Sequence, residues 1–471
     1  MDRYTMRKRI IATSLNKKRF LSGVFLTLLA TVVNAQPFPY QQAGLPVSQR
    51  VDDLMKRMTL EEKIAQIRHL HSWDIFNEQT LDKEKLTAVV GETGYGFVEG
   101  FPLTGENCRS SMREIQEYML TRTRLGIPAF TVAESLHGSA HEGSTIFPQN
   151  IALGSTFNPA LAYRRACMTA DDLHAQGMRQ VLAPCIDVVR DLRWGRVEES
   201  YGEDPYLCGI FAQSEVKGYL DSGISPMLKH YGPHGNPLGG LNLASVDCGL
   251  YDLHAVYLKP FEMVLRHLPV YAVMSTYNSW NRIPNSASRY LLTDILRDRW
   301  GFKGYVVSDC GGPSLLVSAH KYVKTKEAAA ALSIKAGLDL ECGDDVYDQP
   351  LLSAYRQYMV TDADIDSAAY RVLRARMELG LFDSGEQNPY TKISPAVIGS
   401  AEHQEVALNA ARECIVLLKN QKKMLPLNAR KVKSIAVVGI NAGSSEFGDY
   451  SGLPVIAPIS VLQGIKDRVG D

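Results

Sequence analysis

GYVVSDC, residues 304–310, begins with five uncharged residues, two of them β-branched, and carries a carboxylate, Asp309, at its sixth position. Tyr305, Val306 and Val307 are typical of a buried β-strand, and a short apolar run that begins at a glycine is typical of a strand covered on both faces. A charged group is costly at such a place, since burial removes its water. We therefore expect a buried strand that presents Asp309 at its C-terminal end.

Other stretches of the chain repeat this pattern. Helical segments with apolar residues at intervals of three to four, such as residues 161–178, separate the strand-like runs. This alternation predicts an α/β fold with a parallel sheet, for which a TIM-like (β/α)8 barrel is the simplest closed form and a doubly wound open sheet is the alternative. The further strand-like runs are GYGFVEG (94–100), PAFTVAES (128–135), QVLAPCIDVV (180–189), MLKHYG (227–232), VYAVMSTYN (270–278) and AGLDLEC (336–342).

Polar side chains gather at the C-terminal ends of these runs. In a parallel barrel the strand ends share one face, and that face holds the active site in enzymes of this architecture. The pattern therefore indicates an enzyme or a ligand-binding barrel. The residues are Glu134, His137, Asp187, Lys229, His230, Tyr277, Asn278, Asp309 and Glu341.

Composition and the N-terminus narrow the class of protein. Lys and Arg total 51 and Asp and Glu total 51, so no charge excess favours a nucleic-acid partner. Basic residues precede the apolar run FLSGVFLTLLATVV (20–33), and VNA (33–35) offers small residues for cleavage. We interpret residues 1–35 as a secretory signal peptide, with an uncleaved membrane anchor as the alternative. The expected location is therefore outside the cytoplasm, in the periplasm, with no membrane span after cleavage.

A change in composition marks a domain boundary. LGLFDSGEQNPY (379–390) collects turn-forming residues after a long helical run. We expect the barrel over residues 36–385, a linker over 386–405, and the N-terminal part of a second α/β domain over 406–471. That part should contain a helix over 403–420 and a strand in SIAVVGINAG (434–443).

The eight cysteines are scattered singly along the chain, which favours buried free thiols over a cysteine-based metal site. The sequence contains no glycine-rich phosphate loop, no HExxH and no GxSxG motif. We therefore expect neither a cofactor nor a metal. Carboxylates, cations and an aromatic residue on one face suit a polyhydroxylated ligand such as a sugar.

These motifs resemble glycoside hydrolase family 3, on its β-glucosidase and β-xylosidase side. The resemblance covers nearly all of the chain after the leader, which is a strong signal because the blocks occur in the family's order. They are RVDDLMKRMTLEEKIAQI (50–67), ESLHG (134–138), FPQNIALGSTFNP (147–159), RWGRVEESYGEDPYL (193–207), KHY (229–231), MSTYN (274–278), GFKGYVVSDC (301–310), IVLLKN (415–420) and LPL (425–427).

The resemblance implies a role for each matching position. Asp309 corresponds to the nucleophile of a retaining, exo-acting glycosidase, which forms a covalent glycosyl-enzyme. The implied substrate is a terminal sugar of an oligosaccharide or an aryl glycoside. Glu134 is one methylene longer than the Asp that glucosidases carry there, which would crowd a C6 hydroxymethyl and favours xylose over glucose. The implied sugar-binding residues are Glu134, Arg196, Lys229, His230, Met274 and Tyr277.

The general acid/base departs from the pattern of the family. Two-domain members take this glutamate from further along the second domain than this sequence extends, and Glu446 does not match that position. We therefore weigh a sugar-binding remnant or gene fragment with little turnover as an alternative. A β-N-acetylhexosaminidase is a minor alternative, because Gly249 stands where those members carry a catalytic histidine; His234 and His254 would be its weak candidates.

Overall fold

The computed structural model describes most of the chain from residue 38 onward. The signal peptide predicted at residues 1–35 lies outside the described residues. No described helix has the length and apolar character needed to cross a membrane. The described residues are 38–99, 104–343, 346–383, 393–428 and 430–470.

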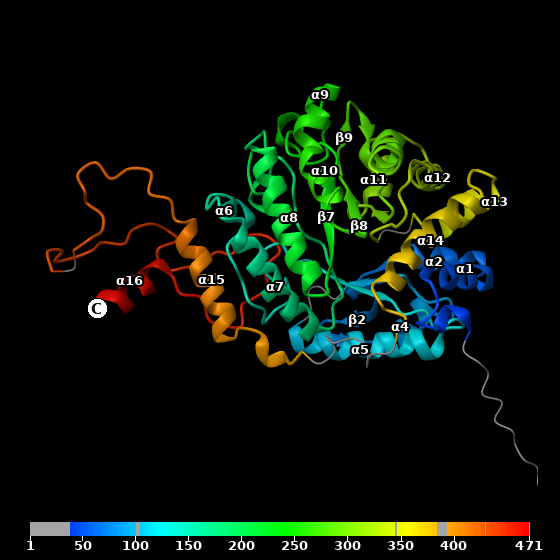
Figure 1. Cartoon of the computed structure of the whole chain (residues 1–471), viewed down its shortest axis with the longest axis horizontal. Helices are drawn as coiled ribbons and strands as arrows, with labels where there is room; N and C mark the ends of the chain where they lie inside the picture. The colour runs from blue at the N-terminus through cyan, green and yellow to red at the C-terminus, as the bar shows by residue number, and fades with distance from the viewer. Residues whose placement is uncertain (1–37, 100–103, 344–345, 384–392, 429, 471) are drawn as a thin grey trace, which may run out of the picture. The chain divides into compact units, whose positions relative to one another are not determined.

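Parallel strands form the central sheet. Two parallel bridges close it, Val307 to Leu340 and Arg68 to Glu341, so that residues 340–341 take the eighth position between the last strand and the first. This arrangement confirms the predicted TIM-like barrel (Figure 1). In spatial order the strands are β1 (His69–Leu70), β4 (Phe97–Glu99), β5 (Phe130–Ala133), β6 (Gln180–Val181), β7 (Ser225–Tyr231), β8 (Ala272–Ser275) and β11 (Tyr305–Val307).

Helices follow the strands and cover the outside of the sheet; α8, for example, packs on α7, α10 and β7 (Figure 1). The α-helices are α1 (Val47–Arg57), α2 (Leu60–Gln66), α3 (Ser72–Ile75), α4 (Lys83–Val90), α5 (Gly105–Arg122), α6 (Asn150–Gly154), α7 (Pro159–Gln176), α8 (Pro205–Asp221), α9 (Leu250–Asp252), α10 (Lys259–Leu265), α11 (Gly312–Ser318), α12 (Lys326–Ala336), α13 (Gln349–Arg356), α14 (Asp362–Glu378), α15 (Ala401–Cys414) and α16 (Val461–Val469). Shorter elements are the 3-10 turns η1 (Pro39–Gln41), η2 (Val197–Glu199), η3 (Leu238–Gly240), η5 (Asn285–Ala287) and η9 (Pro395–Val397), the π-helices η4 (Leu253–Tyr257) and η6 (Tyr290–Arg299), and the hairpins β2 (Phe76–Asn77) with β3 (Thr80–Leu81) and β9 (Ser279–Trp280) with β10 (Ile283–Pro284).

Local sequence signals explain where several helices begin and end. Thr361 caps α14 and forms a capping box with Asp364, so two free N–H groups of the first turn find partners. Asp204 caps α8 by accepting from the backbone N–H of Leu207. Gly177 ends α7 in the left-handed conformation, at a φ of 85°, which residues with a Cβ rarely adopt.

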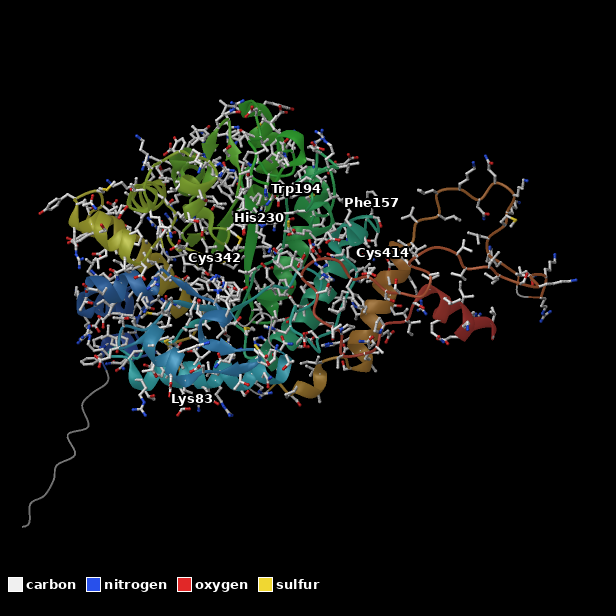
Figure 2. The ribbon with its side chains drawn as sticks, turned by 180° about the vertical axis from the view of Figure 1, so that it is seen from behind. Lys83, Phe157, Trp194, His230, Cys342 and Cys414 are labelled. Atoms are coloured by element: carbon white, nitrogen blue, oxygen red, sulfur yellow. A yellow bond between two sulfur atoms is a disulfide. The ribbon has the colours of Figure 1, made fainter. Side chains whose placement is uncertain are left out.

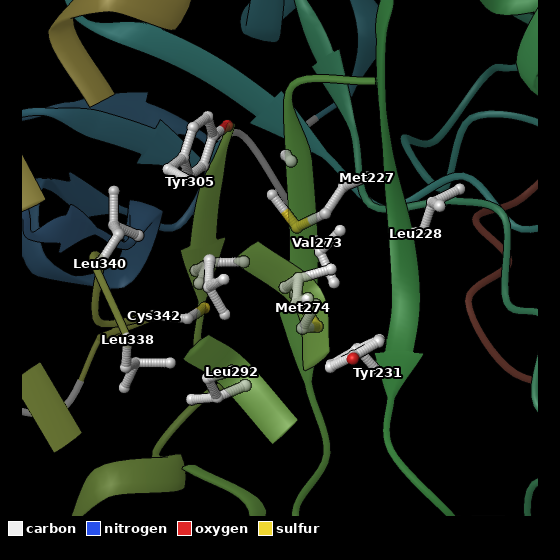
Figure 3. Packing of buried hydrophobic residues seen from close by; sticks show 14 of the residues in the cluster. Met227, Leu228, Tyr231, Val273, Met274, Leu292, Tyr305, Leu338, Leu340 and Cys342 are labelled. Atoms are coloured by element: carbon white, nitrogen blue, oxygen red, sulfur yellow. The ribbon is translucent and has the colours of Figure 1, made fainter. Parts of the chain in front are cut away.

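The hydrophobic core lies within the barrel and beneath its helices. Met227 and Leu228 of β7, Val273 of β8 and Tyr305 of β11 are each at most 1% exposed. Figure 3 shows these residues and Leu340 of the closing segment in the same cluster, with Tyr305 nearer to Leu340 than Leu228 is. The closing segment therefore contributes to the same core as the regular strands, although it forms only single bridges with its neighbours.

Three local predictions need correction. The strand β1 was not predicted, because it is only two residues long. The helix expected over 403–420 is α15 and stops at Cys414, and no strand forms over 434–443. Val438 and Ile440 are 86% and 98% exposed, because no described strand pairs with this segment to bury them. The predicted domain limits at 385 and 405 stay predictions.

We expect Asp339 to be a principal support of the closing segment. The carboxylate is buried and accepts from the Val306 backbone N–H at 2.8 Å, from Arg297 and from Arg371 at 2.6 Å. Asp339→Ala would leave both guanidinium groups without their anion and should cost about 3–5 kcal/mol of unfolding free energy. Urea unfolding followed by circular dichroism measures this loss. Asp298→Ala, at an exposed site, is the control, and equal losses in the two variants would contradict the assignment.

Candidate active site

Asp309 lies two residues beyond the end of β11, and its side chain is held at the strand ends. Its Oδ1 accepts from the backbone N–H of Cys310 at 2.9 Å. Its Oδ2 is 3.4 Å from Arg196 Nη1 and 3.4 Å from His230 Nε2. The residue is 6% exposed, so a buried carboxylate faces a guanidinium and an imidazole.

Arg196 is fixed in place by Glu199. The turn η2 brings Glu199 back toward the arginine, and Nε and Nη2 donate to its two carboxylate oxygens at 2.6 and 2.9 Å. This paired contact uses one edge of the planar guanidinium and leaves Nη1 directed at Asp309. The arginine therefore has little freedom to turn away from the carboxylate.

His230 is oriented by Asp187 of the neighbouring strand end. Asp187 Oδ2 lies 2.7 Å from His230 Nδ1. His230 and His234 hold the pKa of Asp187 below its usual range against the opposing effect of burial, so its carboxylate is ionised and Nδ1 must donate the proton. Burial, with Arg196 nearby, lowers the pKa of His230 to about 4. His230 is thus neutral at neutral pH, and its Nε2 accepts from Arg196 Nη2 at 3.0 Å.

The charges around Asp309 keep it ionised. Burial raises the pKa of the carboxyl, but His230, Arg196 and Lys229 lower it more, so the pKa lies below its usual range. Because His230 is uncharged at neutral pH, Arg196 and Lys229 are the cations that act there. An ionised carboxylate held between hydrogen-bond donors is suited to attack an electrophilic carbon.

Glu134 and Lys229 form a buried ion pair. Lys229 Nζ lies 3.1 and 2.8 Å from the two carboxylate oxygens of Glu134. Burial raises the pKa of Glu134, and Glu99 and Glu199 add to that effect while Lys229 opposes it. Glu134, just after β5, and Lys229 of β7 were both predicted to bind the sugar, and they therefore contact each other directly.

Tyr277 also belongs to this group. Its ring centre is 5.9 Å from the Arg196 guanidinium carbon. Burial, and then the nearby Asp309 carboxylate, raise the pKa of its hydroxyl well above the usual range, so the hydroxyl stays protonated as a donor. Met274 differs from the other predicted site residues, since it pairs with Val307 across β8 and β11 and is 1% exposed within the hydrophobic core (Figure 3).

A segment near the C-terminus reaches the same site, which the sequence did not indicate. We name residues 447–455 the strap. Tyr450 lies with its ring centre 4.9 Å from Lys229 Nζ, and first Glu134 and then burial raise the pKa of its hydroxyl. Only the glycines on either side of this aromatic residue, in FGDYSG (447–452), hint at a special loop.

Hydrogen bonds hold the strap on the barrel. The carbonyl of Asp449 lies 3.1 Å from His137 Nε2, and its N–H donates to Glu198 at 2.9 Å. The N–H of Val455 donates to the carbonyl of Ser144 at 3.0 Å. The strap therefore forms part of the wall around the candidate site.

One cysteine prediction is wrong. Cys310, next to Asp309, is joined by a disulfide to Cys342. Thirty-two positions separate them in sequence, but the closing bridge from Val307 to Leu340 brings their backbones together. Figure 2 labels His230 and Cys342 among the side chains of the barrel. The remaining cysteines are free thiols; Cys108, Cys185 and Cys208 are buried as predicted, whereas Cys167, Cys248 and Cys414 are only half-buried.

A barrel with charged residues at its strand ends is typical of an enzyme or a ligand-binding protein, and comparison with known proteins identifies the family. The sequence model of the glycosyl hydrolase family 3 N terminal domain matches residues 59–375, and that of the C-terminal domain matches residues 415–471. The chain therefore belongs to glycosyl hydrolase family 3.

The names of the chain's relatives refer to two sugars, xylose and glucose. A β-xylosidase from Formosa agariphila is 35% identical over 74% of this chain and 52% of its own length. A periplasmic β-glucosidase from Salmonella typhimurium is 34% identical over 89% of this chain and 54% of its own. A β-glucosidase structure from Erythrobacter marinus, 31% identical, has a TM-score of 0.84 over 92% of this chain and 58% of its own. The chain thus spans about half the length of these relatives.

The close contact of the strap with the barrel should require that residue 452 has no side chain. A Cβ there would lie 2.8 Å from backbone atoms of His141 and Glu142. Gly452→Ala should therefore push the strap away at a cost of about 1–3 kcal/mol, which corresponds to roughly 5- to 150-fold faster exchange. Hydrogen–deuterium exchange of residues 447–455, read by mass spectrometry, measures this change. Gly443→Ala, where nothing lies within 4 Å, is the control, and identical exchange in both variants would contradict the prediction.

Proposed function

We propose that the chain contributes the nucleophile site of an exo-acting, retaining β-glycoside hydrolase that releases terminal β-xylose or β-glucose. The observation that carries the proposal is the buried Asp309 carboxylate, which faces Arg196 and His230 and has a lowered pKa. The basic and apolar leader at residues 1–35 supports export as part of this proposal.

In the proposed first step, Asp309 attacks the anomeric carbon, the bond to the leaving oxygen breaks, and a general acid protonates that oxygen; the same group takes a proton from water in the second step. Arg196 and the Tyr277 hydroxyl hold the carboxylate in place for this attack. Water then cleaves the covalent glycosyl-enzyme and restores Asp309, with retention of configuration. The Glu134–Lys229 pair supplies an acceptor and donors for the hydroxyls of the bound sugar.

A leaving group that departs without protonation tests Asp309 separately from any acid catalyst. Dinitrophenyl 2-deoxy-2-fluoro-xyloside and the matching glucoside should label Asp309, which peptide mass mapping detects. Asp309→Asn should lose the label and at least about 10³-fold of the turnover of dinitrophenyl xyloside. Asp247→Asn, an exposed carboxylate, should keep both.

A folded protein that takes no label would contradict the nucleophile assignment. If calorimetry then detects a bound monosaccharide, the sugar-binding remnant replaces the hydrolase as the better description. Labelling by an N-acetylglucosamine analogue in preference to both other sugars would favour the hexosaminidase alternative.

Glu134 is the proposed determinant of sugar size. Glu134→Asp shortens the side chain by one methylene and should make room for the C6 hydroxymethyl of glucose. The ratio of kcat/KM for nitrophenyl glucoside to that for nitrophenyl xyloside should rise about 10- to 200-fold. Glu134→Gln keeps the length, so its ratio should not move toward glucose even though both activities fall. A ratio that is unchanged in Glu134→Asp would contradict this role.

A further inference from the structure

A second group of polar side chains lies at the ends of β1 and β4, and the proposed hydrolysis does not use it. His69 and His71 come from β1 and the residue just after it, and Glu99 ends β4, its parallel neighbour. All three are buried, at 5–6% exposure. Glu99 Oε2 is 2.6 Å from His71 Nδ1 and 3.9 Å from His69 Nε2. Two imidazoles therefore converge on one carboxylate oxygen.

The protonation of His69 follows from its other contact. Its Nδ1 lies 3.1 Å from Cys342 Sγ, and a disulfide sulfur has no proton to donate. Nδ1 must therefore carry the hydrogen of this contact. In the neutral ring one nitrogen carries the hydrogen and the other accepts, so Nε2 holds an unprotonated lone pair.

His69 Nε2 has no hydrogen-bond partner among the described groups. A buried polar atom in this condition is unfavourable, and a bound ion or water would satisfy it. The His71–Glu99 contact is satisfied by itself, but it does not explain why a second imidazole directs a free lone pair at the same carboxylate. An electron-pair acceptor between them would explain it.

We propose that His69, His71 and Glu99 form a binding site for a divalent transition-metal cation such as Zn²⁺. Two imidazoles and one carboxylate make up a common zinc donor set, with ligand distances of about 2.0–2.2 Å and an open fourth position. The 3.9 Å separation of His69 Nε2 and Glu99 Oε2 can be spanned by one ion. The 2.6 Å separation is a hydrogen bond, so the cation replaces the proton on His71 Nδ1 and that contact widens.

The surrounding rings hold the ligands in place before the ion arrives. His71 stacks on Trp73 with ring centres 4.0 Å apart and on His69 at 4.9 Å, and the edge of Phe97 meets His69 at 6.3 Å. Fixed ring planes reduce the reorganisation that binding requires. The hydrogen of His71 then moves from Nδ1 to Nε2, and because acid protonates the free ligands, binding should weaken as pH falls.

Cobalt(II) provides a direct test, because its visible d–d absorption reports tetrahedral nitrogen and oxygen ligands. The protein is kept non-reducing, so that Cys310 and Cys342 stay joined and offer no thiolate. Titration should give one Co²⁺ per chain, and added Zn²⁺ should displace it. His69→Gln and Glu99→Gln should weaken binding by about 100-fold or more.

His267→Gln, at an exposed position outside the cluster, is the matched control and should bind as the unchanged protein does. Far-UV circular dichroism verifies that each variant is folded. Absence of a stoichiometric band would overturn the proposal. So would a band that survives in folded His69→Gln, because the ion would then lie elsewhere, for example at Cys185, Asp187 and His230. Neither readout depends on glycoside hydrolysis.

Discussion

The structure of the site depends on one constraint: a buried carboxylate stays ionised only if fixed positive groups offset its lost hydration. Asp309 meets this requirement through Arg196, and Arg196 in turn is held by Glu199. Lys229 pairs with Glu134, but there burial outweighs the cation and the pKa of Glu134 is raised to about 7. Each of the two cations thus contacts at least one carboxylate. Removing one member leaves another buried charge without its partner, so the site is stable only as a set.

Much of the barrel and of the site could be predicted from the sequence because both follow local rules. A buried strand that ends on a polar residue gives the same signal at Glu134, Lys229 and Asp309, and a parallel barrel brings such ends to one face. The two-residue strand β1 gives no such signal, since it is too short for a period. The contact of Tyr450 with Lys229 joins positions far apart in the chain, so no local pattern contains it. The Cys310–Cys342 bond was missed for the same reason.

The C-terminal segment shows that a sequence preference for β-structure does not by itself produce a strand. SIAVVGINAG has the composition of a strand, yet residues 434–443 form none, since a strand is stable only where another strand completes its hydrogen bonds. The strap, a little further on, has no regular secondary structure but is ordered by its bonds to His137, Glu198 and Ser144. Hydrogen-bond partners on the barrel therefore determine which parts of the C-terminal segment are held against it.

The disulfide has a consequence for how the chain finds its fold. Cys310 and Cys342 enclose α11 and α12 in a covalent loop, and the loop's two ends are the last regular strand and the segment that closes the barrel. In an oxidised chain that has lost its structure, these two neighbours stay tethered. Val307 and Leu340 then stay close together in the unfolded chain. The entropy cost of closing the loop between them has therefore already been met before they pair. The bond thus links the order of barrel assembly to the redox state of the compartment where the protein folds.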